Sequence, residues 1–357
     1  MEIRSILSIK DNDIQDLLRC SEYHWFHHTQ SWLDYSLNMR ESGSKDLSFG
    51  IIQDTKLVAF CPLVKEYIFN RKSENEFSMA GLPTVYPVFI NGLSKSNKDK
   101  IEKLIFEHVF NLAKSEDISY INYYVSPLSD VVLNNKILVN PLTRFGFHDT
   151  TVSTNILKLG MDENDLFKKF RKGTKSEIKT AIRNNITVKI YSDQNIDSDI
   201  FDIYRELHFR ASGRQTRPDK TWELMLEWIQ SGYSILAIVS KGDERIAAQL
   251  VNVFCNKAYY HSGATDPKFD REKGVGHIGQ WEIIKYLNKT GTKYYDLGLN
   301  MYPNISQEVA DKKLLGISRF KSGFGGDIYP FFRGEWFRNK DIMMKVYQNR
   351  VHDFFRE

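Results

Sequence analysis

Apolar and β-branched residues recur in two matching series along the chain, and each series predicts a β-hairpin, then a helix, then a strand. In the first half, residues 48–53 (SFGIIQ) and 57–64 (LVAFCPLV) predict two strands around the polar turn 54–56. In the second half, residues 233–239 (YSILAIV) and 245–254 (RIAAQLVNVF) predict the equivalent hairpin. Matching elements lie roughly 175 to 185 residues apart, which favours a duplicated α/β lobe over a chance similarity of α/β patterns.

Apolar residues at helical spacing follow each hairpin. In the first half, Ser96 is the expected N-cap, with Asp99 three residues on, and the apolar stripe is Ile101, Leu104, Ile105, Val109 and Leu112. The next strand is expected at residues 118–125. In the second half, the stripe is Ile278, Trp281, Ile284 and Leu287. Gly291 ends that helix, and residues 292–299 (TKYYDLGL) predict the strand after it.

These elements predict an α/β protein with two lobes, each a mixed, mostly antiparallel sheet flanked by helices. A chain of 357 residues is also too long for one typical hydrophobic core. The expected division is 1–157, 158–330 and a helical tail, 331–357, that packs back on the first lobe.

The composition is that of an ordinary globular protein, with 41% apolar and 26% charged residues. A net charge of +4 does not resemble a dedicated nucleic-acid binder. The three cysteines are far apart and have no metal-binding or disulfide spacing. No signal peptide or membrane span is expected, so we predict a cytoplasmic protein with no metal site.

One segment between the lobes is strongly basic. Residues 166–190 contain eight basic residues and one acidic residue. Thr174 and Glu177 have capping-box spacing, which predicts a helix within the basic segment 168–183. Two interpretations stay open: a solvated helix face, or a surface for a polyanion such as a nucleotide-linked substrate or a transfer RNA.

Several stretches of the second half resemble the FemAB-like acyltransferase family of the GNAT superfamily. They are residues 167–188 (FKKFRKGTKSEIKTAIRNNITV), 295–298 (YDLG) and 319–326 (RFKSGFGG), in the family's order. The resemblance covers residues 167–330 well and the first lobe weakly, through HHTQSWLDYSL at 27–37. It implies two GNAT-like lobes and the transfer of an acyl or aminoacyl group to an amine. Known members use aminoacyl-tRNA to extend peptidoglycan precursors, and relatives use thioester donors.

The loop at 271–276 fits the pattern with which GNAT enzymes bind the pyrophosphate of coenzyme A. Arg271, Gly274, Val275 and Gly276 are the expected donor-binding residues. Glycines allow close approach to phosphates, and unpaired amides at a helix start favour an anion by about 0.3–1 kcal/mol. Arg271 can add a charge-assisted contact. A tight turn before a helix is the alternative. The loop favours acyl-CoA, or an acyl carrier protein, over aminoacyl-tRNA as donor.

Acyl transfer to an amine requires a base and a group that polarises the carbonyl. Asp296, at the end of the YYD strand, is the candidate base, with a structural helix-capping carboxylate as the alternative. His261 is a second candidate base, with a structural histidine as its alternative. The family resemblance implies that Lys321 contacts the donor or its carbonyl. Arg319 would share a face with Lys321 if this segment is a strand.

Acceptor-binding candidates are scattered along the chain. Residues 80–89 predict a proline-rich loop in which Tyr86 could line a cleft between the lobes. Residues 208–225 predict a loop leading into a helix, where Arg210, Arg214 and Arg217 could bind a phosphate or carboxylate. Asn300 and Tyr302 follow the YDLG strand and are further candidates.

The sequence therefore predicts an N-acyltransferase that acts on an amine of a nucleotide sugar, glycan or peptide precursor of the cell envelope. Direct attack on a thioester is expected, because no cysteine has the context of a nucleophile. One alternative is an aminoacyl-tRNA-dependent transferase. A second is a non-catalytic glycan- or nucleotide-binding protein. Hydrolase, metalloenzyme and kinase motifs are absent from the sequence.

Overall fold

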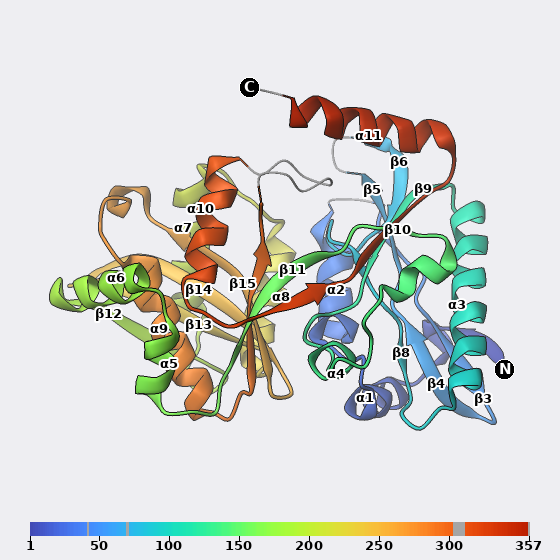
Figure 1. Ribbon diagram of the computed structural model, residues 1–357, viewed down its shortest axis with the longest axis horizontal. Coiled ribbons are helices and arrows are strands. Elements are labelled where there is room, and N and C mark those ends of the chain that lie inside the picture. Colours follow the sequence, from blue (N-terminus) through green and yellow to red (C-terminus); the bar gives the residue numbers. More distant parts are fainter. Residues whose placement is uncertain (41–42, 69–70, 303–310, 356–357) are drawn as a thin grey trace. The chain divides into compact units, whose positions relative to one another are not determined.

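The computed structural model describes residues 1–40, 43–68, 71–302 and 311–355 of an α/β protein (Figure 1). The chain divides into two compact units. Unit 1 holds residues 1–153 and 329–357, and unit 2 holds residues 154–301 and 311–328. Each unit contains one mixed sheet flanked by helices, and unit 1 has a second, antiparallel sheet.

Unit 1 is built on two sheets. One has the strand order β1-β3-β4-β8, and the other has the order β10-β18-β9-β6-β5-β2, with β7 beside β9. The strands are β1 (Glu2–Ser5), β2 (Lys45–Asp46), β3 (Phe49–Gln53), β4 (Lys56–Cys61), β5 (Val64–Ile68), β6 (Arg71–Phe77), β7 (Thr84–Val85), β8 (Val88–Phe89), β9 (Ile118–Tyr124), β10 (His148–Asp149) and β18 (Arg333–Phe337). The helices are α1 (Asp11–Cys20), α2 (Gln30–Met39), α3 (Lys95–Ser115), α4 (Asp130–Leu133) and α11 (Lys340–Phe354).

The predicted hairpin, helix and strand of the first half are β3, β4, α3 and β9. The helix begins earlier than expected, because Ser94 is its N-cap and accepts the amide of Asn97 at 3.2 Å. Ser96 therefore lies inside the helix. The apolar stripe is confirmed at Ile101, Ile105 and Val109, which are fully buried.

Two further details of unit 1 differ from the sequence prediction. The tail is not wholly helical, since Arg333–Phe337 forms strand β18 and pairs antiparallel with β9. Trp336 and Phe337 on this strand have the aromatic character typical of strands. The proline-rich segment 80–89 also contains the short strands β7 and β8, whose four residues are all buried.

Unit 2 has one sheet of seven strands, in the order β12-β13-β14-β15-β16-β11-β17. The strands are β11 (Val152–Lys158), β12 (Ile186–Tyr191), β13 (Ser234–Lys241), β14 (Glu244–Phe254), β15 (Lys257–Thr265), β16 (Tyr294–Asn300) and β17 (Asp327–Phe331). The helices are α5 (Glu163–Lys169), α6 (Lys172–Arg183), α7 (Ser198–Ser212), α8 (Asp219–Gln230), α9 (Val275–Lys289) and α10 (Lys312–Ser322). The apolar face of α9 packs into the core of this unit.

The basic segment forms two helices, α5 and α6, separated at Phe170 and Arg171. Phe170 is buried and packs edge-on against Trp281 and Phe324, which fixes the break in the apolar core. The spacing of Thr174 and Glu177 predicts Thr174 as an N-cap, but the N-cap of α6 is Arg171. Thr174 is a buried residue within α6.

The RFKSGFGG segment is also different from the expected strand. Residues 312–322 form helix α10, so Arg319 and Lys321, two positions apart, do not share a face. Gly323 follows the last residue of this helix, and a Cβ there would lie 2.3 Å from the Thr174 hydroxyl oxygen. Gly326 has a φ of +94° and its Cβ would meet the Ile156 carbonyl at 2.8 Å. The glycines of this motif therefore serve packing.

Candidate active site

The sheet of unit 2 opens between two neighbouring parallel strands. β15 and β16 pair at Lys257–Tyr294, Ala258–Tyr295 and Tyr259–Asp296, and their register ends there although both strands continue. Strands that separate in this way leave backbone N–H and C=O groups facing the gap, where an extended ligand can bind. Asp296 lies at the point of separation.

Asp296 is buried, with 2% of its surface exposed, and its carboxylate is held by two donors. The Thr154 hydroxyl donates to Oδ1 at 2.5 Å, and the Gly298 amide donates to the same oxygen at 2.7 Å. Burial raises the pKa of Asp296 to about 6, although both hydrogen bonds and the charge of Lys321 lower it. A carboxylate with a pKa near neutrality can both accept and release a proton at physiological pH.

Lys321 approaches the same strand from helix α10. A Cβ added at Gly298 would lie 2.6 Å from the Lys321 ammonium nitrogen, and Gly298 has a φ of +99°. The same nitrogen is 5.8 Å from the ring centroid of Tyr260 on β15. Burial lowers the pKa of Lys321, and the charge of Asp296 raises it. The structure thus brings the predicted base and the predicted cation to the middle of one strand, β16.

The predicted donor loop forms the start of α9, and the structure gives Gly274 a packing role that the sequence does not predict. Gly274 has a φ of +81°, and a Cβ there would lie 2.2 Å from the Glu177 carbonyl oxygen of α6. A glycine is therefore required by the turn and by packing against α6. A Cβ at Gly276 would make only ordinary contacts of 3.5 Å or more with Phe320 and Gln249.

The first turn of α9 offers hydrogen-bond donors to an anion. The helix bonds begin with the amide of Ile278, which donates to the Gly274 carbonyl at 2.8 Å. Among the described residues, the amides of Val275, Gly276 and His277 have no acceptor. Val275 is itself buried, and Arg271 is exposed next to the loop. The nearby Glu272 is paired with Lys241 at 2.6 Å, so its charge is compensated.

His261 lies on β15 where the register with β14 shifts, and its ring meets Trp228 edge-on at 5.6 Å. Burial and the charge of Arg217 lower the pKa of His261 to about 3. A histidine with so low a pKa is a weak base at neutral pH. The environment of His261 therefore suits a base much less well than that of Asp296.

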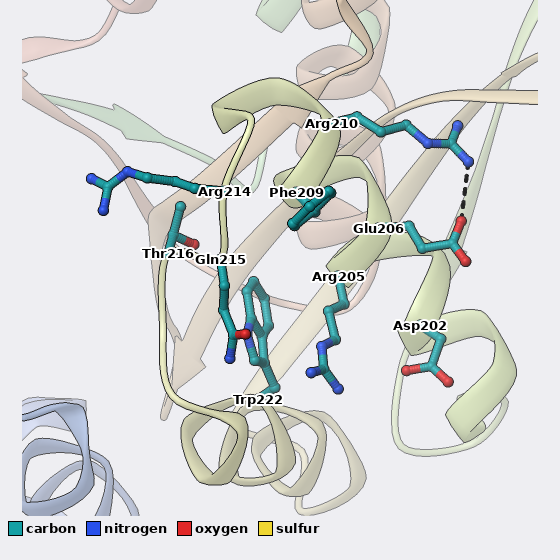
Figure 2. A pocket seen from close by; sticks show the side chains of 9 residues that line it. All are labelled: Asp202, Arg205, Glu206, Phe209, Arg210, Arg214, Gln215, Thr216 and Trp222. Atoms are coloured by element: carbon teal, nitrogen blue, oxygen red, sulfur yellow. Dashed lines mark hydrogen bonds and ion pairs between the residues drawn. The ribbon is translucent and has the colours of Figure 1, made fainter. Parts of the chain in front are cut away.

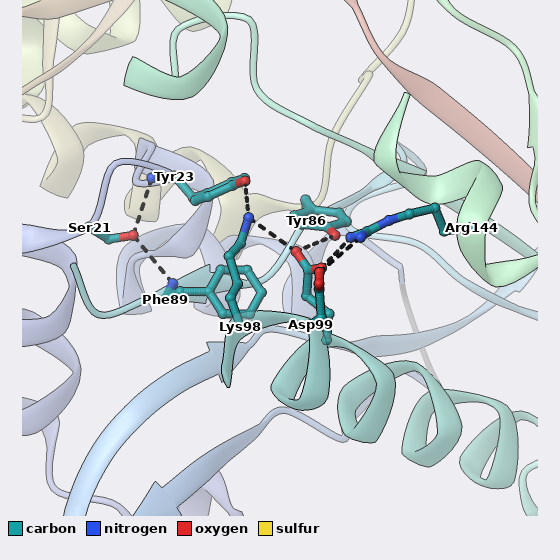
Figure 3. Close-up of polar contacts among 8 residues, drawn as sticks. Ser21, Tyr23, Tyr86, Phe89, Lys98, Asp99 and Arg144 are labelled. Atoms are coloured by element: carbon teal, nitrogen blue, oxygen red, sulfur yellow. Dashed lines mark hydrogen bonds and ion pairs between the residues drawn. The ribbon is translucent and has the colours of Figure 1, made fainter. Parts of the chain in front are cut away.

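Each predicted acceptor residue has its own surroundings within its unit. Tyr86 does not line a cleft: it is 1% exposed, and its hydroxyl donates to the buried Glu102 of α3 at 3.0 Å. Lys98 and Arg144 complete this cluster within unit 1, as Figure 3 shows. Because these groups satisfy one another, Tyr86 has a structural role.

Asn300, Tyr302 and Arg319 also have distinct surroundings. Asn300 is buried and accepts a hydrogen bond from Asn155 at 2.5 Å, which joins β16 to β11. Tyr302 is 51% exposed. Arg319 is exposed, and its carbonyl accepts the guanidinium of Arg171. None of these contacts defines a substrate site.

Arg214 contributes to a hollow of about 500 Å³ between α7 and α8 (Figure 2). The hollow is lined by Asp202, Arg205, Glu206, Phe209, Arg210, Arg214, Gln215, Thr216 and Trp222. Arg205 and Arg210 have acidic partners, whereas the described side chains include none for Arg214. Trp222 is 3% exposed, and its buried indole N–H has no acceptor within the described chain.

Sequence reasoning missed Thr154, Gly298 and Trp222. Thr154 is 142 positions away from Asp296, so no local pattern relates the two residues. Gly298 belongs to the YDLG motif, but its importance lies in the space that it leaves for the side chain of Lys321 from helix α10. An unpaired indole nitrogen becomes visible only when its surroundings are known.

Helices with the length and apolarity of a membrane span are not found in the described part of the chain.

Comparison with known proteins gives one family match and several structural matches. Residues 168–308 match the model of the acetyltransferase (GNAT) domain. The crystal structure of FemX matches with a TM-score of 0.65 and 14% identity, over 98% of this chain and 100% of FemX.

Two other structures also match over nearly the full length. The C-terminal domain (DUF2156) of a putative lysylphosphatidylglycerol synthetase from Agrobacterium fabrum has a TM-score of 0.57 and 11% identity, over 96% of each chain. A tandem GNAT protein from the clavulanic acid biosynthesis pathway has a TM-score of 0.50 and 9% identity, over 95% of this chain and 99% of that one. At these identities the structural matches establish the fold. No curated protein matches the sequence significantly.

Proposed function

Because this chain is a GNAT-domain protein with the tandem fold seen in FemX, we propose that it transfers an acyl group from a thioester, acyl-CoA or a phosphopantetheine carrier, to an amine. The observation that carries the proposal is the position of Asp296. This buried carboxylate, with a pKa near 6, lies where two parallel strands separate and close to a lysine ammonium. Perturbed carboxylates of this kind are concentrated at functional sites.

The donor fits the first turn of α9. Its pyrophosphate accepts hydrogen bonds from the free amides of Gly276 and His277. The exposed Arg271 adds a positive charge beside the loop. The extended arm of the donor runs into the gap between β15 and β16 and uses the backbone groups there. When bound, the donor supplies an acyl carbon activated by its thioester bond.

The residues of the site then perform two tasks. Asp296 accepts the proton that the amine loses as its nitrogen bonds to the acyl carbon. Lys321 donates a hydrogen bond to the carbonyl oxygen, which gains negative charge as the C–N bond forms and loses it when the C–S bond breaks. The leaving thiolate takes up the proton that Asp296 accepted from the amine, so an amide and a thiol are formed. One hydrogen-bond donor to the carbonyl oxygen accounts for about 10²–10³-fold in rate.

The acceptor is anchored in the hollow between α7 and α8. Arg214 binds a phosphate or carboxylate of the acceptor, since this guanidinium has no acidic partner among the described side chains. The exposed ring of Phe209 offers an apolar contact for the rest of the molecule. An amine on a nucleotide sugar, glycan or peptide precursor of the cell envelope has this combination of groups, and we expect the transfer to take place in the cytoplasm.

The alternative donor is an aminoacyl-tRNA, and the surface of α5 and α6 favours it. Six exposed basic side chains lie on or between these helices: Lys168, Lys169, Arg171, Lys172, Lys179 and Arg183. α6 packs against the start of α9, so this surface adjoins the donor loop. A non-catalytic protein that keeps the fold is the second alternative. It gives no account of the raised pKa at Asp296.

A thiol-release assay tests the proposal. The protein is incubated with acetyl-CoA and a panel of amines that carry a phosphate or carboxylate, and free thiol is measured with and without each amine. We expect amine-dependent thiol release that is lost in Asp296→Asn. Arg214→Gln should raise the KM for the amine about 10-fold, the loss of one charge-assisted contact. Arg183→Gln, on the exposed side of α6, is the matched control.

A further inference from the structure

A chain of three buried hydrogen bonds crosses the core of unit 2 from β16 to the first turn of α9. The Tyr295 hydroxyl donates to Gln280 Oε1 at 2.7 Å, and Gln280 Nε2 donates to Gln249 Oε1 at 3.2 Å. Gln249 Nε2 then donates to the Gly276 carbonyl at 3.1 Å. Tyr295 and Gln280 are fully buried, and Gln249 is 4% exposed.

The direction of this chain is fixed by its last member. A backbone carbonyl can only accept a hydrogen bond, so the amide nitrogen of Gln249 must face Gly276. Its oxygen then faces Gln280, whose nitrogen donates and whose oxygen accepts. The Tyr295 hydroxyl is therefore a donor, and all three dipoles point toward the Gly276 carbonyl.

The chain ends on the peptide that carries a free donor. The Gly276 carbonyl belongs to the same peptide group as the His277 N–H, which has no acceptor among the described residues. A hydrogen bond to the carbonyl side of a peptide polarises the group and strengthens its N–H as a donor. It also fixes the orientation of the peptide plane.

One glycine of α9, Gly279, leaves room for the amide of Gln249. A Cβ at Gly279 would lie 2.6 Å from Gln249 Oε1 and 2.9 Å from its Cδ. A Cβ at Gly276 would lie 3.8 Å from Gln249 Nε2. The side of α9 that faces β14 is therefore shaped around a polar side chain.

This arrangement is costly for stability alone. The surrounding core is apolar, with Val251, Ile278, Ile283 and Ile284 among its members. Two glutamine amides buried there gain little over well-packed apolar side chains, because each hydrogen bond only compensates a lost contact with water. Stability thus gives no reason to keep three polar groups in a row.

We infer that Gln249, Gln280 and Tyr295 are positioning residues that orient and polarise the Gly276–His277 peptide for an anionic phosphate donor. The inference rests on the proposed donor site at the start of α9. The three hydrogen bonds also connect the first turn of α9 to Tyr295, the neighbour of Asp296 on β16. They thereby hold the phosphate-binding amides at a fixed position relative to the strand that carries the base.

Gln249→Met removes the donor to Gly276 and keeps the length of the side chain. We expect calorimetry to show about 10-fold weaker binding of coenzyme A, as for the loss of a hydrogen bond of about 1.4 kcal/mol. Tyr295→Phe removes only the far end of the chain and should weaken binding by about 2–3-fold. In ¹⁵N-labelled protein without ligand, the His277 amide proton should move upfield in Gln249→Met, which reports weaker polarisation.

Asn252→Leu is the matched control, because Asn252 is a buried amide on the same strand that donates to Ser234 on β13 at 2.9 Å. It should lower stability without changing coenzyme A affinity or the His277 signal. If the wild type binds coenzyme A and Gln249→Met binds it equally well, the positioning role is wrong and the donor site stands. If Asn252→Leu weakens binding as much as Gln249→Met, the effect is general destabilisation. If the wild type does not bind coenzyme A, both the donor site and the positioning role are wrong.

Discussion

The ammonium of Lys321 lies against the backbone of Gly298, 2.6 Å from the position that a Cβ there would occupy. The last turn of helix α10 and the middle of strand β16 thus meet at a place where only a glycine leaves space for the lysine. Gly298 also donates its amide to Asp296, so one residue orients both proposed catalytic groups.

Gly298→Ala should therefore displace Lys321 and lower turnover by about 10²-fold, the effect of removing one carbonyl-polarising donor. The left-handed φ of +99° adds strain on the order of 1–3 kcal/mol. Gly291→Ala separates the two effects, since Gly291 has a φ of +85° and open space around it. Thermal unfolding and the thiol-release assay should show similar destabilisation in both variants but a loss of turnover only in Gly298→Ala. Equal turnover in the two variants would show that Lys321 is not needed at this position.

Thr154 should set the pH at which the site becomes active. Its hydroxyl stabilises the charged form of Asp296 and so lowers the pKa of that group from the value that burial alone would impose. Turnover should rise with pH through an apparent pKa of about 6 in the wild type. In Thr154→Val this limb should move to higher pH, because the charged carboxylate loses a donor.

The pH–rate profile of Thr221→Val is the control for Thr154→Val. Thr221 is fully buried and donates to the Pro218 carbonyl at 2.6 Å, away from Asp296. Turnover of Thr221→Val should rise with pH over the same range as turnover of the wild type. A limb that does not move in Thr154→Val would assign the pH dependence to another group.

Much of unit 2 could be predicted from sequence, and the exceptions have physical reasons. The hairpin, helix and strand were predicted from periodicity because each has a clean apolar face, as Ile278, Ile284 and Leu287 show in α9. The break between α5 and α6 was missed because it depends on Phe170 packing against residues more than 100 positions away. Arg319 and Lys321 were placed on a possible strand because the segment lacks a clear apolar period.

The candidate site joins residues that the sequence predicts with residues that only the structure identifies. Asp296 and Lys321 were named through the family resemblance, and the structure brings them near each other. Tyr86 was misplaced because its partner, Glu102, lies on a different element, and a buried acid–tyrosine pair leaves no local signal. The packing of Gly274 against the carbonyl of Glu177 likewise leaves no local signal, and the role of Gly274 in donor binding stays a prediction.

The surface of α5 and α6 should bind RNA negligibly if the donor is a thioester. A filter-binding assay with transfer RNA at two salt concentrations tests this for the wild type and for the triple variant Lys172→Gln, Lys179→Gln, Arg183→Gln. Strong, salt-dependent binding whose slope falls by about 0.7–0.9 per removed charge in the variant would favour the aminoacyl-tRNA alternative. The matched control neutralises Lys100, Lys103 and Lys114 on α3.

Acid should destabilise unit 1 through His28. Burial lowers the pKa of this histidine to about 4, while it donates from Nε2 to the Tyr86 carbonyl at 2.8 Å in its neutral form. The unfolded chain binds a proton below about pH 6.5 and the folded chain does not, so stability is lost as pH falls from 6.5 toward 4. The loss is about 1.4 kcal/mol per pH unit. Urea unfolding of His28→Gln should show a lower stability at pH 7.5 but a flatter decline toward pH 4.5. An unchanged decline would mean that other groups cause the acid sensitivity.

Calorimetric titration of the purified protein with coenzyme A tests the central claim most directly. We expect one site per chain in the wild type and strongly reduced affinity in Gly276→Val, whose Cβ would meet only Phe320 and Gln249 at ordinary distances and whose methyl groups should cover the free amides of α9. Gly276→Val should keep the thermal stability of the wild type within about 1 kcal/mol, since no close contact is created. The absence of coenzyme A binding in a folded wild-type protein would contradict the thioester donor, and equal binding by Gly276→Val would contradict the site.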